Sequence, residues 1–597
     1  MSLAVSFQTI PEMFDRITEK YAEIPRPLLM QKIDGKWVSH EFSEVRDMVE
    51  STTAGLAAFG VRENDRIAII SENRPEWVFC DQAIAAIGAI SVPLYPTLTS
   101  RQIEEIFLDA DISYAIVSNS FQLKKILPFL SKINSLRKII VFTDKELPAK
   151  ENIFSFVNLL LEGDAYLETH PNYFSECIKK IGDERLLTII YTSGTTGIPK
   201  GAMLTHRNVV SNIKASVEAL PIGADDVFLS FLPLCHAFER MAGYYTAMSC
   251  GATIAYAESI ETVRDNLKEI RPTIMTAVPR FFERIYNSIE KQVSLQSRTK
   301  QKVFMACLRI GKEFAEAKKV NSVSLLMKLK HRIAHKLVFE ALHTNTGGRI
   351  KFFVSGGGPL AQRLGEFFES VGLQIIEGYG LTESSPVLSV NRVEKYKFGT
   401  VGLPINGVEI TIADDGEILA RGQNIMRGYW NDEFTSRKTV DENGWLHTGD
   451  IGEFDHHGFL KITDRKKNIF VSTGGKKIAP QQIENKLLMS KYIDQILIIG
   501  DERMFLSALL VPDFEALKEI IQSLGITNVL PSEIVNLPAL KEFYTREIQR
   551  LQKDDANFER IRKFVLLPQS FSVENEELTP TQKIRRKIVE TKNKEVI

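Results

Sequence analysis

One lysine and a cluster of small hydroxyl residues form the first group of side chains that could carry out chemistry. In the segment TIIYTSGTTGIPKGAMLTH (188–206), an apolar run rich in β-branched residues ends in a turn of glycine, serine and threonine. Backbone N–H groups and hydroxyls in such a turn bind anions, and glycine lets the backbone approach them closely. Because Lys200 adds a mobile positive charge suited to phosphate, the segment predicts a phosphate-binding loop rather than an ordinary surface turn.

This loop differs from the P-loop of many nucleotide-binding proteins. Ile198 and Pro199 separate its last glycine from Lys200, whereas the Walker pattern requires Gly-Lys-Ser/Thr. An ordinary P-loop ATPase or a kinase is therefore disfavoured, and the loop predicts a phosphate site of another kind.

Length, charge and cysteine content exclude several classes of protein. The chain has 597 residues, 44% of them hydrophobic and 25% charged, which predicts a soluble protein of several domains. A formal net charge of −1 argues against a nucleic-acid binder that relies on global attraction. The five cysteines include no CxxC pair, so they indicate neither a zinc site nor a disulfide framework and fit a reducing cytosol.

Membrane-directed segments are not evident in the sequence. The first residues lack the pattern of a signal peptide, and no apolar run approaches the roughly 18 residues of a membrane-spanning helix. The longest candidate, 79–95, carries Asp81 and Gln82 and predicts a buried helix that runs into a strand. We therefore expect membrane association to be peripheral at most.

The first half of the chain alternates short strands with helices. Strands separated by helices imply crossover connections and a mostly parallel, covered sheet. Two later segments, 350–360 and 373–386, repeat a strand that ends in glycines, where α/β proteins place ligands. The earlier predicted strands lie at 65–70, 89–95, 114–118, 137–143, 186–192 and 252–257.

The stretch 285–346 is helical and rich in basic residues. One interpretation is a basic amphipathic surface for anionic lipid. The other, which we prefer at this point, is a helical subdomain with a solvated charged face. The basic residues are Lys318, Lys319, Lys328, Lys330, Arg332 and Lys336, and they interleave with Leu325, Leu326, Leu329, Leu337 and Val338.

The predicted secondary structure changes twice in the C-terminal third of the chain. Asp-Gly and Asn-Gly turns between alternating strands predict hairpins over 399–462. The short charged segment TDRKKN (463–468) predicts a joint between domains. We expect an α/β N-terminal domain at 1–466, with its helical insertion and β-rich subdomain, and a small mobile α+β lid domain at 467–597.

Five motifs occur in order across the chain and resemble the adenylate-forming, AMP-dependent synthetase superfamily. They are YTSGTTGIPKG, EGYGLTESSP, GWLHTGDIG, ITDRKKNIFVSTGGKKIAPQQIE and LTPTQKIRRK. The segment FLPLCHAFER (231–240), the helical insertion and the LTPTQK ending resemble the long-chain fatty acyl-CoA synthetase branch. This resemblance implies a two-step reaction, in which a carboxylate and ATP form an acyl-adenylate and pyrophosphate, and a thiol, usually that of coenzyme A, then displaces AMP.

The resemblance also implies the residues of the nucleotide site. Thr382 is expected to bond the α-phosphate, and Glu383 to hold Mg²⁺, a hard cation suited to carboxylate oxygens. Asp450 and Arg465 are expected to grip the ribose hydroxyls. The phosphate loop comprises Thr192, Ser193, Gly194, Thr195, Thr196, Gly197 and Lys200. Tyr379 and the glycines Gly356, Gly357 and Gly358 are expected around the adenine, and Gly380 is a further cofactor-binding residue.

Four further positions concern the carboxylate, the lid and the thiol. His236 is expected near the reacting carboxylate, where it need not act as a base because a fatty acid is already ionised at neutral pH. Lys583 matches the lid lysine that contacts the carboxylate and the α-phosphate. Lys467 matches the hinge of a large lid rotation, and Gly475 should line the pantetheine tunnel. The predicted catalytic residues are Lys583, Thr382, Glu383 and His236.

The acyl pocket is the least readable part of the sequence, because apolar wall residues and core residues have the same spacing. Its candidates are Tyr244, Tyr245, Ala277, Val278, Phe281, Phe282 and Pro386.

The sequence thus predicts a medium- to long-chain fatty acid–CoA ligase that uses ATP, Mg²⁺ and coenzyme A. One alternative is a synthetase of the same superfamily that acylates an acyl carrier protein. Another is a non-catalytic, membrane-associated sensor of fatty acid or nucleotide, which the intact set of motif residues disfavours. We expect a cytoplasmic protein with no nucleic-acid partner, at most peripheral on the inner face of a membrane, while acyl chain length, membrane association and oligomeric state stay open.

Overall fold

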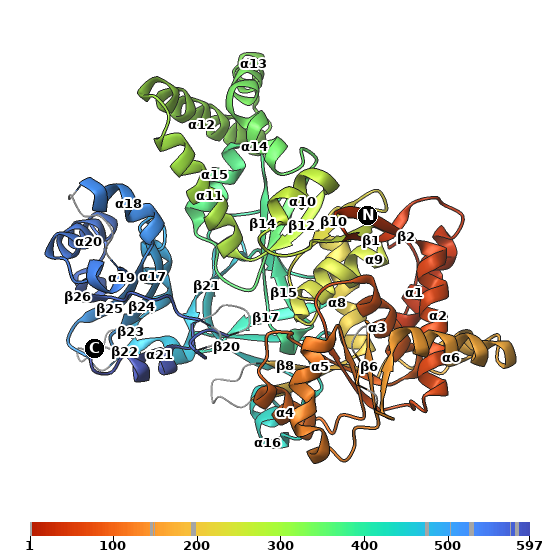
Figure 1. Cartoon of the computed structure of the whole chain (residues 1–597). Helices are drawn as coiled ribbons and strands as arrows, with labels where there is room; N and C mark the ends of the chain where they lie inside the picture. The colour runs from red at the N-terminus through yellow and green to blue at the C-terminus, as the bar shows by residue number, and fades with distance from the viewer. Residues whose placement is uncertain are drawn as a thin grey trace.

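The structure is a computed structural model that describes residues 3–143, 147–148, 150–192, 199–471, 477–501, 503–523, 530–572, 575–579 and 584–597. A large N-terminal domain is followed by a smaller C-terminal domain (Figure 1). Two large sheets organise the N-terminal domain, and helices cover them. The predicted α/β class is confirmed, whereas the predicted domain boundaries and the mobility of the lid stay predictions.

The first sheet has eight strands, and its central part is parallel. β3, β4, β5, β6 and β7 run parallel, and β8 joins β4 in the same direction. β9 and β19 then add antiparallel strands at one edge. In spatial order the strands are β19 (Gly428–Tyr429), β9 (Lys200–Thr205), β8 (Leu186–Thr192), β4 (Ile90–Leu94), β3 (Arg66–Ile70), β5 (Tyr114–Val117), β6 (Lys138–Val141) and β7 (Ile153–Ser155).

The second sheet has nine strands, six of which run parallel. These six end at the same edge, so the loops that follow them lie close together. In spatial order the strands are β16 (Leu403–Pro404), β15 (Val387–Val390), β14 (Ile375–Gly380), β13 (Phe352–Ser355), β12 (Ile274–Ala277), β10 (Val227–Ser230), β11 (Thr253–Tyr256), β1 (Pro27–Ile33) and β2 (Lys36–Glu41).

Helices fill both faces of the sheets. The predicted buried helix is present as α3, which starts at Pro75, ends before Gly88 and has almost every side chain buried, as a helix between two layers requires. The others are α1 (Ile10–Tyr21), α2 (Phe42–Ala58), α4 (Ser100–Asp109), α5 (Ser120–Ile126), η1 (Leu127–Lys132), α6 (Phe156–Thr169), α7 (Tyr173–Ile178), α8 (His206–Ala219), η2 (Glu239–Tyr245), α9 (Thr246–Ser249), α10 (Val263–Ile270), α15 (Gln362–Ser370), η4 (Thr382–Ser384) and α16 (Glu433–Thr439).

A buried ion pair fixes η2, a π-helix, against α3. Arg240 and Asp81 are both almost fully buried and form an ion pair, and the Tyr245 hydroxyl donates to Asp81 Oδ2 over 2.6 Å. Arg240 Nη1 also donates to Thr188 Oγ1 of β8 over 2.8 Å. Because a buried charge is stable only when it is paired, this network holds η2 in one position between the two sheets.

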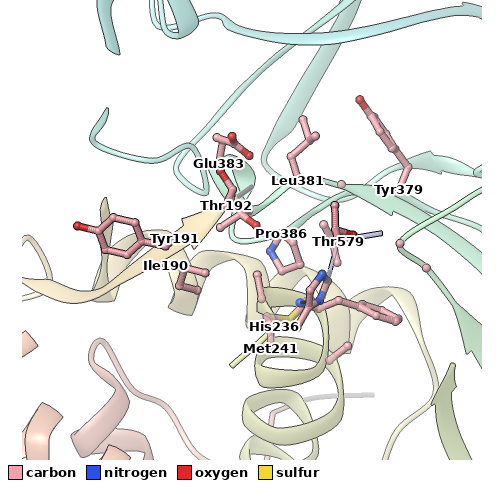
Figure 2. A pocket seen from close by; sticks show the side chains of 18 of the residues that line it. Ile190, Tyr191, Thr192, His236, Met241, Tyr379, Leu381, Glu383, Pro386 and Thr579 are labelled. Carbon is pink, nitrogen blue, oxygen red and sulfur yellow. Dashed lines mark hydrogen bonds between the residues drawn. The ribbon is translucent and has the colours of Figure 1, made fainter. Parts of the chain in front are cut away.

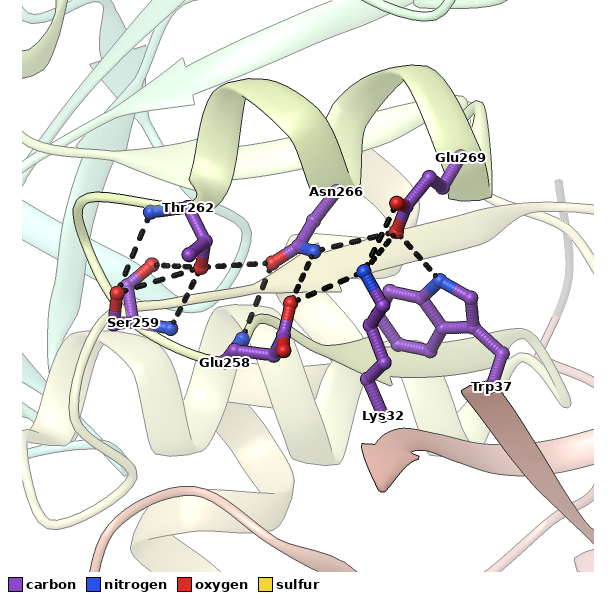
Figure 3. Close-up of polar contacts among 7 residues, drawn as sticks. All are labelled: Lys32, Trp37, Glu258, Ser259, Thr262, Asn266 and Glu269. Carbon is purple, nitrogen blue, oxygen red and sulfur yellow. Dashed lines mark hydrogen bonds and ion pairs between the residues drawn. The ribbon is translucent and has the colours of Figure 1, made fainter. Parts of the chain in front are cut away.

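A second polar cluster, which we call the edge cluster, fastens the hairpin β1–β2 to the sheet (Figure 3). Lys32 Nζ lies 2.9 Å from Glu269 Oε1 and 3.3 Å from Glu258 Oε2. The Trp37 indole donates to Glu269 Oε2 over 2.9 Å, and Asn266 Nδ2 donates to Glu258 Oε2 over 3.0 Å. The cluster therefore joins two distant segments of the chain, the N-terminal hairpin and α10, at the edge of the second sheet.

The remaining elements form a helical insertion, a β-rich unit and the C-terminal domain. The insertion contains α11 (Pro279–Ser294), α12 (Arg298–Lys319), α13 (Leu325–Ala334), η3 (His335–Phe339) and α14 (Glu340–Asn345). The β-rich unit contains β17 (Val408–Ile412), β18 (Glu417–Gly422), β20 (Leu446–Phe454) and β21 (Leu460–Arg465). The C-terminal elements are η5 (Lys466–Asn468), β22 (Phe470–Val471), β23 (Lys477–Ile478), α17 (Pro480–Leu487), β24 (Ile493–Ile499), β25 (Leu506–Pro512), α18 (Phe514–Ser523), α19 (Pro531–Ile534), α20 (Pro538–Leu551), η6 (Asn557–Glu559), β26 (Ile561–Leu566) and α21 (Arg586–Lys592).

Two further observations concern how the domains contact each other and whether the chain could cross a membrane. Arg280 Nη2 of α11 lies 2.5 Å from Asp494 Oδ1 of β24, so an ion pair joins the insertion to the C-terminal domain. In the described ranges, no helix combines the length and apolar character that crossing a bilayer demands.

Candidate active site

A cavity of about 480 Å³ lies where the strands of both sheets end. Thr192 at the end of β8, Gly356 after β13 and Tyr379 in β14 line it, as do residues of β20, η5 and the C-terminal domain. Side chains of Thr192, Glu383, His236 and Pro386 face the same hollow (Figure 2). The crossover topology thus brings together segments that are far apart in the sequence.

Glu383 lies on the single turn η4 at the polar end of the cavity. The Tyr429 hydroxyl donates to Glu383 Oε1 over 2.7 Å, and the second carboxylate oxygen has no partner among the described residues. Burial and the neighbouring carboxylate raise the pKa of Tyr429, which keeps this hydroxyl a donor. The next residue back, Thr382, lines the cavity beside it.

Tyr379, Asp450 and Arg465 form a fixed group that joins β14 of the second sheet to the β-rich unit. Asp450 of β20 pairs with Arg465 of β21, and Asp450 Oδ1 lies 3.2 Å from Arg465 Nε. The buried Tyr379 hydroxyl donates to Asp450 Oδ2 over 2.8 Å. Tyr379 and Arg465 line the cavity, whereas Asp450 lies just behind them.

Two lysines reach the cavity in different surroundings. Lys200 Nζ lies 3.6 Å from Asp432 Oδ2 and donates to Thr435 Oγ1 over 3.2 Å, so its ammonium group contacts the N-terminal end of α16. Lys467, in η5, makes no hydrogen bond or ion pair within the described part of the chain. Burial lowers the pKa of Lys467, and the charge of Arg465 adds to this, while Asp450 and Glu383 oppose it.

His236 lines the cavity between its two ends. The backbone N–H of Phe238 donates to His236 Nδ1 over 3.2 Å, so a neutral ring carries its proton on Nε2. The ring of Tyr95 lies nearby, with its centroid 6.5 Å from that of His236. These two contacts hold the imidazole ring at the cavity wall.

The other end of the cavity is apolar, and its wall differs from the sequence prediction. Of the seven acyl-pocket candidates, only Pro386 lines the cavity; Tyr244, Tyr245, Ala277 and Phe282 are buried core residues, and Val278 and Phe281 pack beside the core. The prediction was wrong for these six residues, because strand and helix periodicity cannot separate a wall from a core. The apolar lining comprises Leu220, Ile222, Phe228, Met241, Ala242, Ile274, Val354, Val387 and Val390.

Glycines shape one wall of the cavity. A Cβ on Gly380 would lie 1.8 Å from the backbone oxygen of Pro386, and a Cβ on Gly356 would lie 2.9 Å from the ring of Phe238. Gly357 has a φ of +77° and lines the cavity, whereas Gly358 is exposed beside Pro279. At Gly356 and Gly380, therefore, the absence of a side chain follows from close packing.

Several predicted site residues lie outside the described residues: Ser193, Gly194, Thr195, Thr196, Gly197, Gly475 and Lys583. The described ones that line the cavity are Thr192, Lys200, His236, Gly356, Gly357, Tyr379, Gly380, Thr382, Glu383, Arg465 and Lys467.

Family models match most of the chain. Residues 19–430 match a model described as AMP-binding enzyme, and residues 467–597 match one described as AMP-binding enzyme C-terminal domain. The chain belongs to the AMP-binding enzyme family. The resemblance inferred from the five motifs is thereby confirmed.

Relatives of this AMP-binding enzyme cover nearly its whole length. The long-chain-fatty-acid–CoA ligase FadD15 of Mycobacterium bovis is 33% identical over 94% of this chain and 92% of its own. The peroxisomal long chain acyl-CoA synthetase 7 of Arabidopsis thaliana is also 33% identical, over 97% of this chain and 84% of its own. The chloroplastic long-chain-fatty-acid–[acyl-carrier-protein] ligase AEE15 of the same plant is 27% identical, over 99% of this chain and 86% of its own.

Solved structures support the fold. The anthranilate CoA ligase AuaEII, solved with anthranoyl-AMP, superposes with a TM-score of 0.71 at 19% identity, covering 98% of this chain and 97% of its own. The adenylation domain of a carboxylate reductase from Mycobacterium chelonae gives a TM-score of 0.73 at 22% identity, covering 98% of this chain and 90% of its own.

The donor set of the AMP-binding enzyme suits Mg²⁺ better than a tightly held structural metal. The described residues contain no group of three or more His, Cys, Asp or Glu that could hold a metal ion. Mg²⁺ is commonly bound by one or two carboxylates together with substrate phosphates. Glu383, with one carboxylate oxygen unpartnered at the polar end, fits that mode.

Sequence reasoning missed two residues that shape the site. Tyr429 fixes the Glu383 carboxylate although the two residues are 46 positions apart in the sequence, and no local sequence pattern predicts that contact. Glu239 lies fully buried beneath the cavity, where Thr276, itself a lining residue, donates to it. Burial raises the pKa of Glu239 to about 7. The only feature of the sequence that could have indicated a role for Glu239 is its position in the segment FLPLCHAFER.

Proposed function

We propose that this AMP-binding enzyme is a long-chain fatty acid–CoA ligase, which converts a medium- or long-chain fatty acid, ATP and coenzyme A into acyl-CoA, AMP and pyrophosphate. The observation that carries the proposal is one cavity whose polar end continues into an apolar end. An acyl-adenylate has the same two halves. The names of the relatives at 31–33% identity over most of the chain point the same way.

In the first half-reaction, a carboxylate oxygen attacks the α-phosphorus of ATP, and the bond from that phosphorus to the oxygen bridging to the β-phosphate breaks. Thr382 holds the α-phosphate, and the loop from Thr192 to Gly197 with Lys200 holds the departing pyrophosphate. Lys583 contacts the carboxylate and the α-phosphate. Glu383 would hold Mg²⁺, which when bound would supply further charge neutralisation. These cationic and hydrogen-bonding groups are needed because a carboxylate and a triphosphate repel each other.

The nucleoside is held by the fixed group on β14, β20 and β21. Asp450 and Arg465 bind the ribose hydroxyls, and Tyr379 frames the adenine with Gly356, Gly357 and Gly358, while Gly380 is a further cofactor-binding residue. The hydrogen bond from Tyr379 to Asp450 supports this role, since it fixes the carboxylate before the nucleotide arrives.

In the second half-reaction, the sulfur of coenzyme A attacks the acyl carbon, the acyl–oxygen bond to AMP breaks, and the thiol proton passes to solvent. The C-terminal domain rotates about Lys467 so that the thiol reaches this carbon past Gly475, while His236 gates the approach to the carboxylate. Such alternation lets one cavity serve two reactions in sequence.

Coenzyme A is the acceptor that we favour. The relative named for an acyl carrier protein is 27% identical, below the 33% of the two relatives named as a CoA ligase and an acyl-CoA synthetase that are cited above. The proposal includes a cytoplasmic enzyme that associates peripherally with a membrane.

Pyrophosphate release over a panel of C2 to C20 acids, with and without coenzyme A, tests the proposal. We expect release to peak at long chains, to need coenzyme A for turnover, and to collapse in Lys583→Ala. Turnover that needs acyl carrier protein instead would move the assignment to the alternative acceptor. No release with any acid, from folded protein that binds ATP, would contradict it and favour a non-catalytic sensor.

A further inference from the structure

The helix α13 exposes a row of large apolar side chains at the end of the insertion. Leu325, Leu326, Leu329, Ile333 and Leu337 are between 53% and 84% exposed. At 3.6 residues per turn, these positions fall on one face that continues from α13 into η3. We call this face the leucine stripe. Contiguous exposed apolar surface of this kind marks an interaction site.

The opposite face of the same helix already supplies the packing that the fold needs. Ala334 and Phe339 are buried, and the His331 ring stacks on Phe314 of α12 with centroids 3.9 Å apart. The leucine stripe is therefore a second apolar face, and the insertion is packed without it.

Basic residues surround the leucine stripe. The segment 318–336 contains six Lys or Arg and no Asp or Glu, in a chain whose formal net charge is −1. Lys319 is engaged, with its Nζ 3.0 Å from Glu369 Oε2. Four of the six basic residues lie within α13 and η3, next to the stripe, and make no ion pair within the described ranges. They are Lys328, Lys330, Arg332 and Lys336. On the helix, Lys330 and Arg332 flank the stripe on its two sides.

The position of the stripe favours a flat, deformable partner. α12 and α13 project from the N-terminal domain, with α13 at the tip (Figure 1). A symmetric contact between two copies would bring the two basic segments together, and this repulsion disfavours a second copy as the occupant. Anionic headgroups complement the charge, and acyl chains accept the leucines.

We propose that α13 and η3 form a docking surface for an anionic lipid bilayer. The helix lies in the plane of the interface, the leucine stripe enters the boundary between headgroups and acyl chains, and the four basic residues bind the headgroups. The inference deepens the membrane association included in the proposed function and rests on it. The test separates it from the catalytic part of that proposal, because vesicle binding is measured without ATP or fatty acid.

Flotation with vesicles tests the docking surface. Wild-type protein should bind vesicles of phosphatidylcholine and phosphatidylglycerol (7:3) and bind pure phosphatidylcholine far less. The variant Lys328→Gln/Lys330→Gln/Arg332→Gln should lose roughly fivefold in partition coefficient for each neutralised charge, and added salt should weaken wild-type binding. The variant Leu325→Ser/Leu329→Ser/Ile333→Ser should lose binding to both vesicles.

The matched control is Val157→Ser/Leu161→Ser on α6. These two residues are 51% and 61% exposed, but α6 carries Glu162, Asp164 and Glu168 and no Lys or Arg. The control should bind like the wild type. All variants alter exposed residues outside the cavity, so pyrophosphate release with a water-soluble acid should be unchanged and reports folding. Equal binding by wild type and both α13 variants, or a stripe-dependent dimer in place of vesicle binding, would overturn the proposal.

Discussion

The edge cluster and the polar end of the cavity use the same types of side chain with opposite results. In the edge cluster, Lys32 contacts two carboxylates, and Glu269 also accepts from Trp37. At the cavity, Glu383 has one partner, and Lys467 makes no hydrogen bond or ion pair in the described ranges. A closed set of polar contacts stabilises the fold, whereas an open set beside a hollow is available to a ligand.

The largest expected effect is on the open set. In Glu383→Gln, pyrophosphate release should fall by about a hundredfold to a thousandfold, because a neutral amide would hold Mg²⁺ far more weakly than the carboxylate does. Thermal stability should change little, since one hydrogen bond from Tyr429 is retained by the amide oxygen. Release rates and melting curves on the same samples check this. Full activity in the variant would contradict the assignment of Glu383.

The apolar end should respond to a change of size. Ala242 lines this end of the cavity, so Ala242→Phe should shorten the space for the acyl chain. We expect kcat/KM for a C16 acid to fall by about a hundredfold relative to a C8 acid. An unchanged preference, measured by competition between the two acids, would show that the chain lies elsewhere. Retained activity on the C8 acid serves as the folding control.

Glu239 lies between these cases, because this buried carboxyl accepts hydrogen bonds but has no cationic partner among the described residues. Its pKa of about 7 exceeds the value of an exposed glutamate, so the folded state binds the proton more tightly than the unfolded state. Its contribution to stability is therefore greatest below pH 4.5 and declines as the pH rises to about 7. In Glu239→Gln this decline should be absent.

The change from pH 5 to pH 8 should therefore favour Glu239→Gln over wild type by about 2–3 kcal/mol in the free energy of unfolding. Melting temperatures across this range, compared between the two proteins, check the sign. A parallel pH dependence in both would mean that Glu239 ionises normally.

The smallest effect is expected at the closed set. In Glu269→Gln, Lys32 keeps Glu258 as a partner, so stability should fall by about 1 kcal/mol or less at neutral pH. Pyrophosphate release should stay at the wild-type level. This variant is the matched counterpart of Glu383→Gln, and a large loss of activity in it would remove the distinction between the two clusters.

The sequence predicted the parts of the site that depend on local patterns. Apolar runs followed by glycines predicted the strands and loops that carry Thr382, Glu383 and Tyr379, and the hairpin turns predicted the strand that carries Asp450. Arg465 was expected in the joint 463–468, whereas it lies at the end of β21 and pairs with Asp450. Contacts between distant segments, such as the one from Tyr429 to Glu383, and the choice between core and cavity wall depend on tertiary packing.

The helical insertion shows the same limit. The interpretation that we preferred from the sequence, a solvated charged face, accounts for Lys328 and Lys330 but leaves the exposed Leu325 and Leu329 without a role. Apolar residues occur on both sides of α13, and only the fold determines which side packs against α12.

A crystal structure of the enzyme with a non-hydrolysable long-chain acyl-adenylate analogue tests the central claim most directly. The account predicts the adenosine beside Tyr379, Asp450 and Arg465, and the acyl chain between Phe228 and Met241 in the apolar end of the same cavity. An analogue whose chain leaves the cavity toward solvent, or whose nucleotide binds away from Tyr379, would contradict it.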